Sequence, residues 1–554
     1  MQSCTTVIKR QGIPINTISE EMEITSSLLF LLILVLPAVA LILPLSQRRR
    51  HRDGSKPPGP PGWPAFGNIF DLGTIPHQTL CFLRPKYGPV IWLKLGSVNT
   101  LVIQSAKAAT ELFKNHDQVF CDRRCPVSIT AHNYNQGSMA VGRYGSYWRM
   151  IRRLCTVEIM VNMRLNETAY LRRKCIDNMI HNMEEDAEVA RAQGEAGELD
   201  LSHFLFLLAF NVIGNLLLSR DLVDSRSKEG REFFNAMGKV MEWGGKPNIS
   251  DFFPVLKWFD PQGIKRNMER DMGTAMKIIS EFVKERMEEK QLGEETITKD
   301  FLDVLLEYQG EGKDGVDKLT EQNVIICILE MFFAGSETSS SAIEWAMAEL
   351  LRHPESMRKV KEELDRVVGP NRKVEESDTE NLPYFQAVIK ETLRLHPALP
   401  LTLPRNAMEE RNFMGYVIPK DTQIWVNSWA IGRDPDAWED PLAFKPERFL
   451  SSKIDYKGQN FELLPFGSGR RICVGMPLAH RVIHLALATL VHHFDWELPI
   501  NTTPKDLDMN ERMGITVRKL VPLRAIPKKH VTQERSKMMT GEKIIREYVI
   551  DQYC

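Results

Sequence analysis

The sequence has almost no net charge and no cysteine framework. Its 71 lysine and arginine residues are balanced by 72 aspartate and glutamate residues, so no global field favours nucleic acid as a partner. The nine cysteines are odd in number and scattered along 554 residues, which is not the pattern of a disulfide-stapled domain. Cys121 and Cys125 have no second pair of ligands nearby and are interpreted as structural. This cysteine usage fits a reducing compartment.

Charged residues are also absent from residues 24–47, which are mostly leucine, isoleucine, valine, alanine and phenylalanine. At roughly 1.5 Å per residue, a helix of this length reaches about 36 Å and crosses a ~30 Å hydrocarbon core. The basic run Arg48-Arg-Arg-His-Arg52 follows at once, and positive charge stays on the cytoplasmic side. The alternative is a cleaved secretory signal, but its charge normally precedes the apolar run. We expect a single-pass transmembrane anchor with the rest of the chain in the cytosol.

The chain shows no internal repeats, and changes in composition along it divide it into five parts. Translation from Met1 and translation from Met22 both remain open. The prolines of Lys56-Pro-Pro-Gly-Pro-Pro-Gly62 fix φ and make a semi-rigid spacer after the anchor. The expected parts are an N-terminal extension (1–23), the anchor (24–47), a basic flank and proline-rich hinge (48–62), one main domain (63–529) and a tail without an assigned role (530–554).

Short runs of β-branched residues separated by turns predict a small sheet. Helical periodicity predicts helices for most of the remaining residues, so the expected fold class is mainly α with a small β-rich region. Strands are expected at 90–95, 100–104, 416–419 and 422–426, and the clearest helices at 271–289, 319–352 and 476–496.

One thiol, Cys473, lies in a glycine-rich turn directly before the helix expected at 476–496. Unpaired N–H groups at a helix N-terminus favour a thiolate, and Arg470 and Arg471 add positive charge. The glycines let the backbone approach a flat ligand closely, and Phe466 can pack beneath that ligand. A thiolate held in this way can ligate iron. The alternative is a small buried hydrophobic residue, which is the commonest state of a lone cysteine.

The pattern Phe466-x-x-Gly469-x-Arg471-x-Cys473-x-Gly475 matches the haem-ligand signature of the cytochromes P450, a family that the chain resembles over residues 24–528. The resemblance implies the cytochrome P450 fold, with residues 63–529 as the catalytic domain. It also implies that haem b (iron protoporphyrin IX) binds here, with Cys473 as the axial ligand of the iron and with Phe466 and Arg471 as cofactor contacts.

The helix expected at 319–352 is apolar nearly all round, which predicts burial, but Ala334-Gly-Ser-Glu-Thr-Ser interrupts it. Glycine and hydroxyl side chains loosen a helical ladder, so we expect a local widening. An alcohol and a carboxylate beside a buried ligand can deliver protons to bound oxygen. Helix packing through small residues is the alternative. The segment resembles the family motif Ala/Gly-Gly-x-Asp/Glu-Thr-Thr/Ser, which implies that Glu337 and Thr338 are catalytic.

Trp148 and Arg152 are four residues apart and share one helical face. An indole N–H and a guanidinium group both donate to carboxylates, although an amphipathic helix with a basic face also explains the spacing. Trp-x-x-x-Arg resembles the family's helix that holds a haem propionate. The resemblance extends this role to Arg405 and Arg471.

Glu391 and Arg394 place opposite charges three residues apart on a helix, as any surface helix can do. The downstream segment Pro446-Glu-Arg448-Phe449 gives this pair its weight, because the family joins the three residues in a buried Glu-Arg-Arg network below the haem. Burial of one carboxylate with two arginines is costly unless every donor is satisfied. We therefore interpret Glu391, Arg394 and Arg448 as a structural lock.

The sequence contains no flavin or nicotinamide motif, since Gly467-x-Gly469 lacks a βαβ setting. By resemblance, electrons for O2 come from NADPH through NADPH–cytochrome P450 reductase, in an endoplasmic reticulum membrane whose lipid is a further contact. Phe333-Ala-Gly-Ser-Glu-Thr and Ile343-Glu-Trp most resemble the plant microsomal group that contains geraniol hydroxylases and iridoid oxidases. That group belongs to secondary metabolism.

The resemblance also implies an apolar substrate pocket, which favours a small terpenoid. An alternative substrate is a phenylpropanoid, a flavonoid or an alkaloid. Two further alternatives are a cytochrome P450 that isomerises or dehydrates without O2, and a haem-binding protein without catalysis. The expected lining residues are Phe333, Ala334, Leu399, Leu401, Thr402 and Met513.

Overall fold

The structure is a computed structural model that describes residues 56–222, 228–292, 299–310, 317–370 and 372–529. The expected N-terminal extension, the anchor and the C-terminal tail lie outside the described residues. The described chain begins within the proline-rich hinge.

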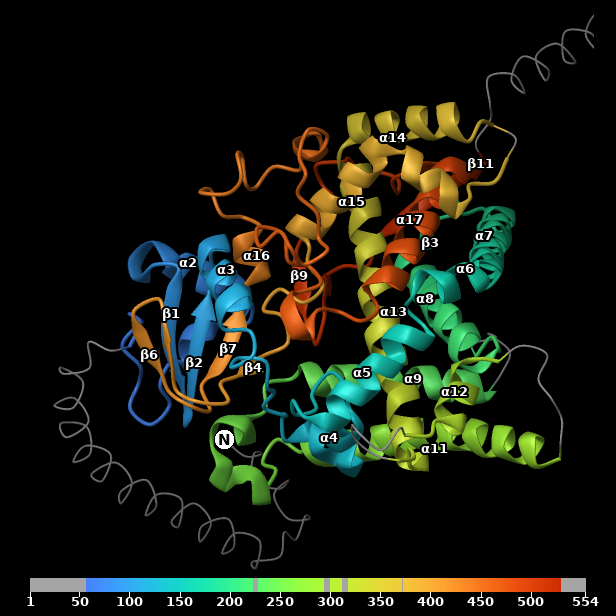
Figure 1. Ribbon diagram of the computed structural model, residues 1–554. Helices are drawn as coiled ribbons and strands as arrows, with labels where there is room; N and C mark the ends of the chain where they lie inside the picture. Colours follow the sequence, from blue (N-terminus) through green and yellow to red (C-terminus); the bar gives the residue numbers. More distant parts are fainter. Residues whose placement is uncertain (1–55, 223–227, 293–298, 311–316, 371, 530–554) are drawn as a thin grey trace, which may run out of the picture.

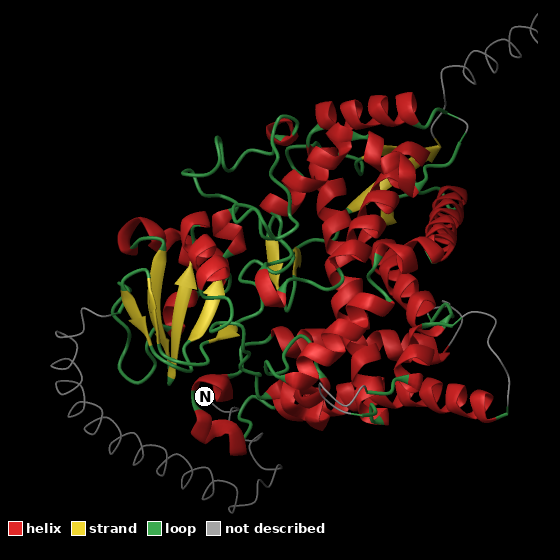
Figure 2. Cartoon of the chain, in the orientation of Figure 1, coloured by secondary structure: helices red, strands yellow, loops and turns green. Residues whose placement is uncertain are grey.

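The described chain forms a large helical part and a smaller strand-rich part, which Figure 1 and Figure 2 show side by side. The helices that build both parts are α2 (Pro76–Tyr87), α3 (Ala106–Asn115), α4 (Tyr134–Gly137), α5 (Ser146–Glu158), α6 (Asn162–Glu167), α7 (Ala169–Ala192), α8 (Leu201–Leu218), α9 (Lys228–Gly245), α10 (Ile249–Phe252), α11 (Ile264–Gln291), α12 (Phe301–Glu307), α13 (Glu321–Arg352), α14 (Pro354–Val367), α15 (Pro383–Leu395), α16 (Ser428–Ile431) and α17 (Met476–His493). The mainly α fold class expected from the sequence is confirmed.

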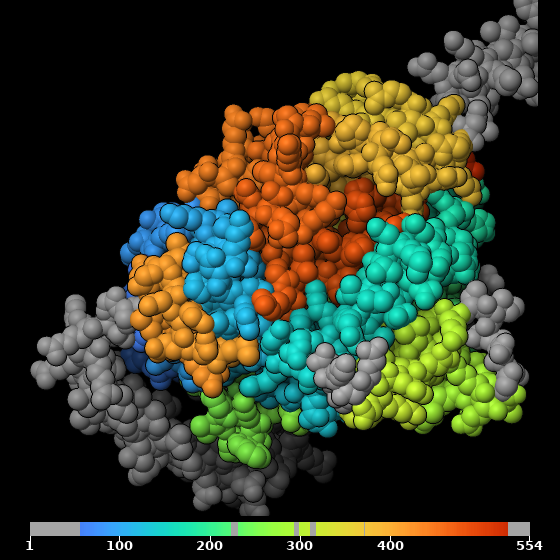
Figure 3. Space-filling model, in the orientation of Figure 1, coloured from blue at the N-terminus to red at the C-terminus, as the bar shows by residue number. Residues whose placement is uncertain are grey.

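The main sheet joins two segments that are far apart in the sequence. Its strand order is β1-β2-β7-β4, with β2 and β7 parallel and the other neighbours antiparallel. Figure 3 shows the blue N-terminal residues and the orange residues around β7 on one lobe of the surface. The strands are β1 (Val90–Leu95), β2 (Val98–Ile103), β3 (Leu199–Asp200), β4 (Arg405–Asn406), β5 (Arg411–Phe413), β6 (Tyr416–Ile418), β7 (Gln423–Val426), β8 (Phe494–Glu497), β9 (Glu511–Met513), β10 (Val517–Lys519) and β11 (Arg524–Lys529).

Helix α13 runs through the middle of the helical part, where it packs against α8, α11, α15 and α17 (Figure 1). Thr320 caps its N-terminus by accepting the N–H of Asn323, and the helix stops before His353-Pro354. Among the described residues, α8 and α13 are long and apolar enough to cross a membrane, but 72% and 78% of their apolar windows are buried inside the protein. Both are core helices.

Two helix boundaries expected from the sequence are wrong. The helix expected at 476–496 ends at His493, because Phe494–Glu497 pairs with β11 as strand β8. Pairing with a distant strand here overrides the apolar helical pattern. The helix expected at 271–289 is longer and covers Ile264–Gln291, since Gly263 with φ 64° provides its N-cap.

A histidine pair lies on α17, in which His484 is buried and His480 is half-buried. The Nδ1–H of His484 donates to the carbonyl oxygen of His480 at 2.6 Å, and the two ring centroids are 3.9 Å apart. The ring of Phe385 meets His484 edge-on at 5.9 Å. Burial lowers the pKa of His484 to about 3, and burial also lowers the pKa of His480. Both folded-state pKa values therefore lie below that of the unfolded chain, about 6.5.

We predict that the free energy of unfolding falls as pH decreases from about 7 to about 5. In this window the unfolded chain binds a proton at His484 and the folded chain does not, which costs up to about 1.4 kcal/mol per pH unit. His484→Asn keeps a side-chain N–H donor but removes the titration, so the drop in Tm becomes smaller. His181→Asn, at a side chain that is 67% exposed, is the control. An unchanged drop in Tm in His484→Asn contradicts the prediction.

Candidate functional site

The cysteine loop is a sharp turn between the short helix Gly469–Arg471 and α17. Gly467 and Gly469 have φ values of 67° and 69°, which only glycine adopts without strain. The N–H of Cys473 donates to the carbonyl oxygen of Phe466 at 3.0 Å, and its sulfur accepts from the backbone N–H groups of Gly475 and Met476. The turn therefore directs the sulfur and supplies donors to it.

The electrostatics of Cys473 differ from the sequence expectation. Burial raises the pKa of the thiol, and this effect outweighs the backbone N–H groups and Arg152, which lower it. Arg470 instead pairs with Asp117 at 3.1 Å. A bound metal ion favours deprotonation of the thiol that ligates it. Of the described cysteines, Cys473 alone is exposed, although protein atoms crowd around it, which fits a side chain that a bound group covers.

Helix α13 is largely buried but has one short accessible strip. Ala334 is exposed and Thr338, one turn later on the same face, is partly exposed, whereas Phe332 and Ser336 are buried. The hydroxyl of Thr338 donates to the carbonyl oxygen of Ala334 at 2.6 Å. The helix continues without a break through this segment, so the expected local widening is absent. The hydroxyl bond satisfies the carbonyl without opening the ladder.

Glu337 is buried on α13 beside this strip. One carboxylate oxygen forms an ion pair with Arg518 of β10, and the other has no hydrogen-bond partner among the described residues. The sequence analysis missed Arg518, because the two residues are far apart in the sequence.

Four predicted donors converge on the segments around the cysteine loop. The indole N–H of Trp148 donates to the carbonyl oxygen of Met139 at 2.8 Å, and the guanidinium of Arg471 lies 4.1 Å from that indole ring. Arg152 donates to the carbonyl oxygen of Ile472 at 2.6 Å. Arg405 pairs with Asp117 at 2.8 Å and donates to the carbonyl oxygen of Ser468 at 2.7 Å.

Arg123 joins this cluster and was missed by the sequence analysis. Its guanidinium donates to carbonyl oxygens at Ala140 and Pro404, at 3.1 and 2.8 Å. Burial and the charges of Arg405 and Arg471 lower its pKa, and burial lowers the pKa of Arg471 to about 10. Because its partners are backbone carbonyls, no charge spacing in the sequence indicates this position.

The cluster carries an excess of buried positive charge. Arg123, Arg405 and Arg471 are at most 9% exposed, whereas Asp117 and Asp122 are the buried carboxylates nearby. Asp117 is also shared with Arg470. Buried cations are stable only when anions compensate them, so this cluster fits a ligand with two carboxylates. Haem, with its two propionates and an iron that a thiolate can ligate, meets this requirement.

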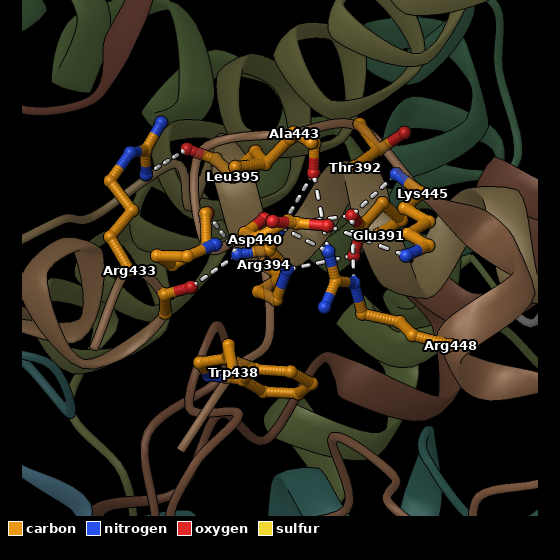
Figure 4. A network of polar contacts seen from close by, with 12 residues as sticks. Glu391, Thr392, Arg394, Leu395, Arg433, Trp438, Asp440, Ala443, Lys445 and Arg448 are labelled. Atoms are coloured by element: carbon orange, nitrogen blue, oxygen red, sulfur yellow. Dashed lines mark hydrogen bonds and ion pairs between the residues drawn. The ribbon is translucent and has the colours of Figure 1, made fainter. Parts of the chain in front are cut away.

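Glu391, Arg394 and Arg448 form one buried network, shown in Figure 4. Arg394 binds both oxygens of Glu391 at 2.7 and 2.8 Å, and Arg448 donates to the same carboxylate at 3.1 Å. The remaining guanidinium N–H groups donate to carbonyl oxygens, including those of Pro441 and Ala443. Both oxygens of Glu391 are therefore bonded, and the second positive charge is held by backbone carbonyls.

The expected pocket residues do not share one environment. Leu401 packs in the core of the strand-rich part with Ile91 and Trp425. Thr402 has φ 52° in a tight turn. Phe333, Leu399 and Met513 are partly buried.

Hydrogen bonds connect the segments that contain the partly buried pocket residues. The N–H of Val517 on β10 donates to the carbonyl oxygen of Ala398 at 2.8 Å. The hydroxyl of Ser341 on α13 donates to the carbonyl oxygen of Val517 at 3.0 Å. Helix α13, the segment around Leu399 and the β9–β10 hairpin therefore adjoin one another.

The thiol of Cys473 is accessible to a ligand although protein atoms surround it, and an excess of buried positive charge lies beside it. Together these two features define a haem-thiolate protein. The chain belongs to the cytochrome P450 family, whose model, described as "Cytochrome P450", matches residues 57–522. A structure of a zebrafish cytochrome P450 with progesterone has the same fold, with a TM-score of 0.70 and 26% identity over 82% of this chain and 99% of that chain.

Plant relatives are more similar in sequence. The chain is 61% identical to an iridoid oxidase of Catharanthus roseus, over 87% of this chain and 94% of the relative. It is 54% identical to cytochrome P450 76A2 of Solanum melongena, over 91% and 99%, and 40% identical to a geraniol 8-hydroxylase of Catharanthus roseus, over 86% and 94%. The protein is therefore a cytochrome P450 monooxygenase that uses haem, a small substrate and a redox partner.

Proposed function

We propose that the protein oxidises a monoterpenoid or iridoid alcohol in plant secondary metabolism. The observation that carries this proposal is the 61% identity to an iridoid oxidase over almost the whole of that relative. The accessible side chain of Ala334 and the partly buried Phe333, Leu399 and Met513 are apolar, which suits a terpenoid better than a sugar or a charged acid. Removal of apolar surface from water supplies the binding free energy, at ~25 cal/mol per Å2.

Each residue of the site has a proposed role. Cys473 holds the haem iron, and Arg123, Trp148, Arg152, Arg405 and Arg471 hold the propionates. Phe466 packs next to the cofactor, and its ring lies 5.4 Å from that of Tyr456, which fixes its position. Haem, when bound, would supply the reductive activation of O2, with one oxygen atom inserted into a C–H bond and the other released as water. The protein's contribution is to position the substrate and to move protons.

Thr338 and Glu337 are the proposed proton carriers. The hydroxyl of Thr338 uses its hydrogen on the carbonyl of Ala334, so its oxygen can accept a proton from a water molecule and pass its own on after the bond to Ala334 breaks. Glu337 has one oxygen without a partner among the described residues. Arg518 binds its other oxygen and thereby orients the carboxylate.

We also propose that the protein is a single-pass protein of the endoplasmic reticulum that receives electrons from NADPH–cytochrome P450 reductase. A large exposed apolar patch supports a membrane position beyond the anchor. Its rings come from two segments that meet where Phe66 packs against Phe253 at 5.6 Å, close to the start of the described chain. The segment that contains residues 253–259 belongs to the green region beneath the blue lobe in Figure 3. The exposed side chains are Trp63, Phe70, Val255, Trp258 and Phe259.

Product analysis with the reductase tests the substrate. We expect geraniol or nepetalactol to be oxidised, with one NADPH consumed per product. Cys473→Ala is the matched control, because loss of the thiolate abolishes the red-shifted Soret band of the ferrous carbonyl complex and the activity together. Oxidation of a phenolic compound or an alkaloid with no terpenoid oxidised would refute the proposal.

Thr338→Ala tests the proton relay. We expect normal haem binding but several-fold more peroxide per NADPH, because an alanine methyl cannot donate a proton. Thr338→Ser keeps the hydroxyl and should keep the coupling. Peroxide release equal to the wild type in Thr338→Ala would assign the relay to Glu337 or to water.

Liposome flotation tests the membrane position. Deletion of residues 1–47 should weaken binding greatly, and the additional change of Trp258 and Phe259 to glutamate should remove what is left, because charged side chains oppose burial in lipid. Tyr170→Glu, at a ring that is 59% exposed elsewhere, is the control for added charge. Full binding of the deletion, or protection of the catalytic domain from protease in intact microsomes, contradicts the proposed topology.

A further inference from the structure

Glu330 is a buried carboxylate on α13 for which the reaction has no role. It is 6% exposed and lies in the apolar stretch between Val324 and Phe332. Glu330 precedes Ala334 by four residues and Thr338 by eight, so all three lie near one face of the helix. A carboxylate at such a position is costly unless its oxygens are bonded.

The partners of Glu330 all come from one short segment, residues 134–142, which contains α4 and part of the turn before α5. The backbone N–H of Met139 donates to Oε2 at 2.7 Å, and the N–H of Ala140 lies 3.2 Å from both oxygens. The hydroxyl of Ser138 donates to Oε1, and the hydroxyl of Tyr134 lies 3.4 Å from it. Both oxygens are used as acceptors, a pattern that a carboxylate satisfies and an amide does not.

The same peptide groups bind the cation cluster through their carbonyls. The carbonyl oxygen of Met139 accepts from Trp148 at 2.8 Å and from Arg471 at 3.1 Å. The carbonyl oxygen of Ala140 accepts from Arg123 at 3.1 Å. Residues 139 and 140 are thus held between a carboxylate on α13 and the guanidinium groups around the cysteine loop.

The segment approaches α13 closely. A Cβ atom at Gly137 would lie 2.9 Å from the side chain of Ile326, which is one turn before Glu330. The ring of Tyr134 meets that of Phe333 edge-on at 6.4 Å. The segment therefore lies against the part of α13 that carries Phe333, one of the proposed pocket residues.

We propose that Glu330 is a positioning residue that holds residues 134–142 as a fixed wall of the substrate site. Glu330 acts through this segment and does not touch the haem. The inference rests on the proposed function only in placing the substrate next to this segment. Without the carboxylate, the N–H groups of Met139 and Ala140 lose their acceptors and the segment moves away from α13.

The test compares Glu330→Gln with Glu344→Gln in the haem-loaded protein. Glu344 is the matched control, because it is also a buried carboxylate on α13 and also accepts a serine hydroxyl (Ser202) and a backbone N–H (Leu523, 2.9 Å). Burial raises the pKa of both carboxyl groups. Tm is recorded for both variants, and only Glu330→Gln should alter residues 134–142.

We measure hydrogen exchange of residues 138–142 and the Kd of 4-phenylimidazole and of imidazole from their Soret shifts. In Glu330→Gln we expect exchange and the Kd of 4-phenylimidazole to rise by at least about tenfold, because the amide keeps only one acceptor oxygen and turns an NH2 group toward the N–H and O–H donors of the segment. The Kd of imidazole, which needs little space, should change by less than about twofold. In Glu344→Gln all three quantities should stay within about twofold of the wild type.

Unchanged exchange and unchanged 4-phenylimidazole affinity in Glu330→Gln would overturn the proposal. An equal loss for both azoles would also overturn it, since it would indicate collapse of the haem site. If Glu330→Gln does not fold, Glu330→Asp is the substitute, because it keeps two acceptors on a shorter side chain. It should raise hydrogen exchange and the Kd of 4-phenylimidazole by a smaller factor and leave the Kd of imidazole unchanged. A wild-type protein that oxidises no terpenoid but shows this pattern would refute the proposed function and leave the role of Glu330 intact.

Discussion

Compensation of buried positive charge is the constraint on which the rest of the structure depends. Three guanidinium groups, of Arg123, Arg405 and Arg471, are buried where the cysteine loop meets the segments before α5. Carbonyl oxygens and two aspartates stabilise them only in part, because a carbonyl dipole does not cancel a full charge. A dianionic ligand completes the compensation, so binding of haem and burial of these arginines stabilise each other. The lock of Glu391, Arg394 and Arg448 differs, since one carboxylate there binds both guanidinium groups directly.

Helix α13 brings the functional parts into one frame. It carries Glu330, the accessible Ala334 and Thr338, and Glu337, within about two turns of one another. Each of the two carboxylates binds a different distant segment: residues 134–142 for Glu330 and strand β10 for Glu337. Residues 134–142, the proposed proton carriers and the β9–β10 hairpin are therefore positioned relative to one helix.

The sequence predicted those parts of the site that have a local spacing. The cysteine turn and the Glu391–Arg394 pair lie within a few residues, so short motifs reveal them. Arg123, Glu330 and Arg518 were missed because their partners lie far away in the sequence and are in part backbone carbonyls or N–H groups, which leave no trace in side-chain spacing. The predicted end of α17 was wrong for a similar reason, since the pairing of β8 with β11 decides where the helix stops. The packing of Leu401 with Ile91 and Trp425 could not be predicted, because an apolar residue suits a core and a pocket equally well.

The peptide groups of residues 139 and 140 explain why the substrate side and the cofactor side are not independent. Their N–H groups face a carboxylate and their carbonyls face cations, so each dipole is aligned between opposite charges. In the low-dielectric interior such an arrangement strengthens each hydrogen bond that links Glu330, residues 139 and 140, and the arginines. Movement of residues 139 and 140 away from α13 removes one partner each from Arg471 and Arg123, which keep their bonds to the carbonyl oxygens of Cys121 and Pro404. The two sides are therefore linked through two peptide groups, but the arginines do not depend on these groups alone.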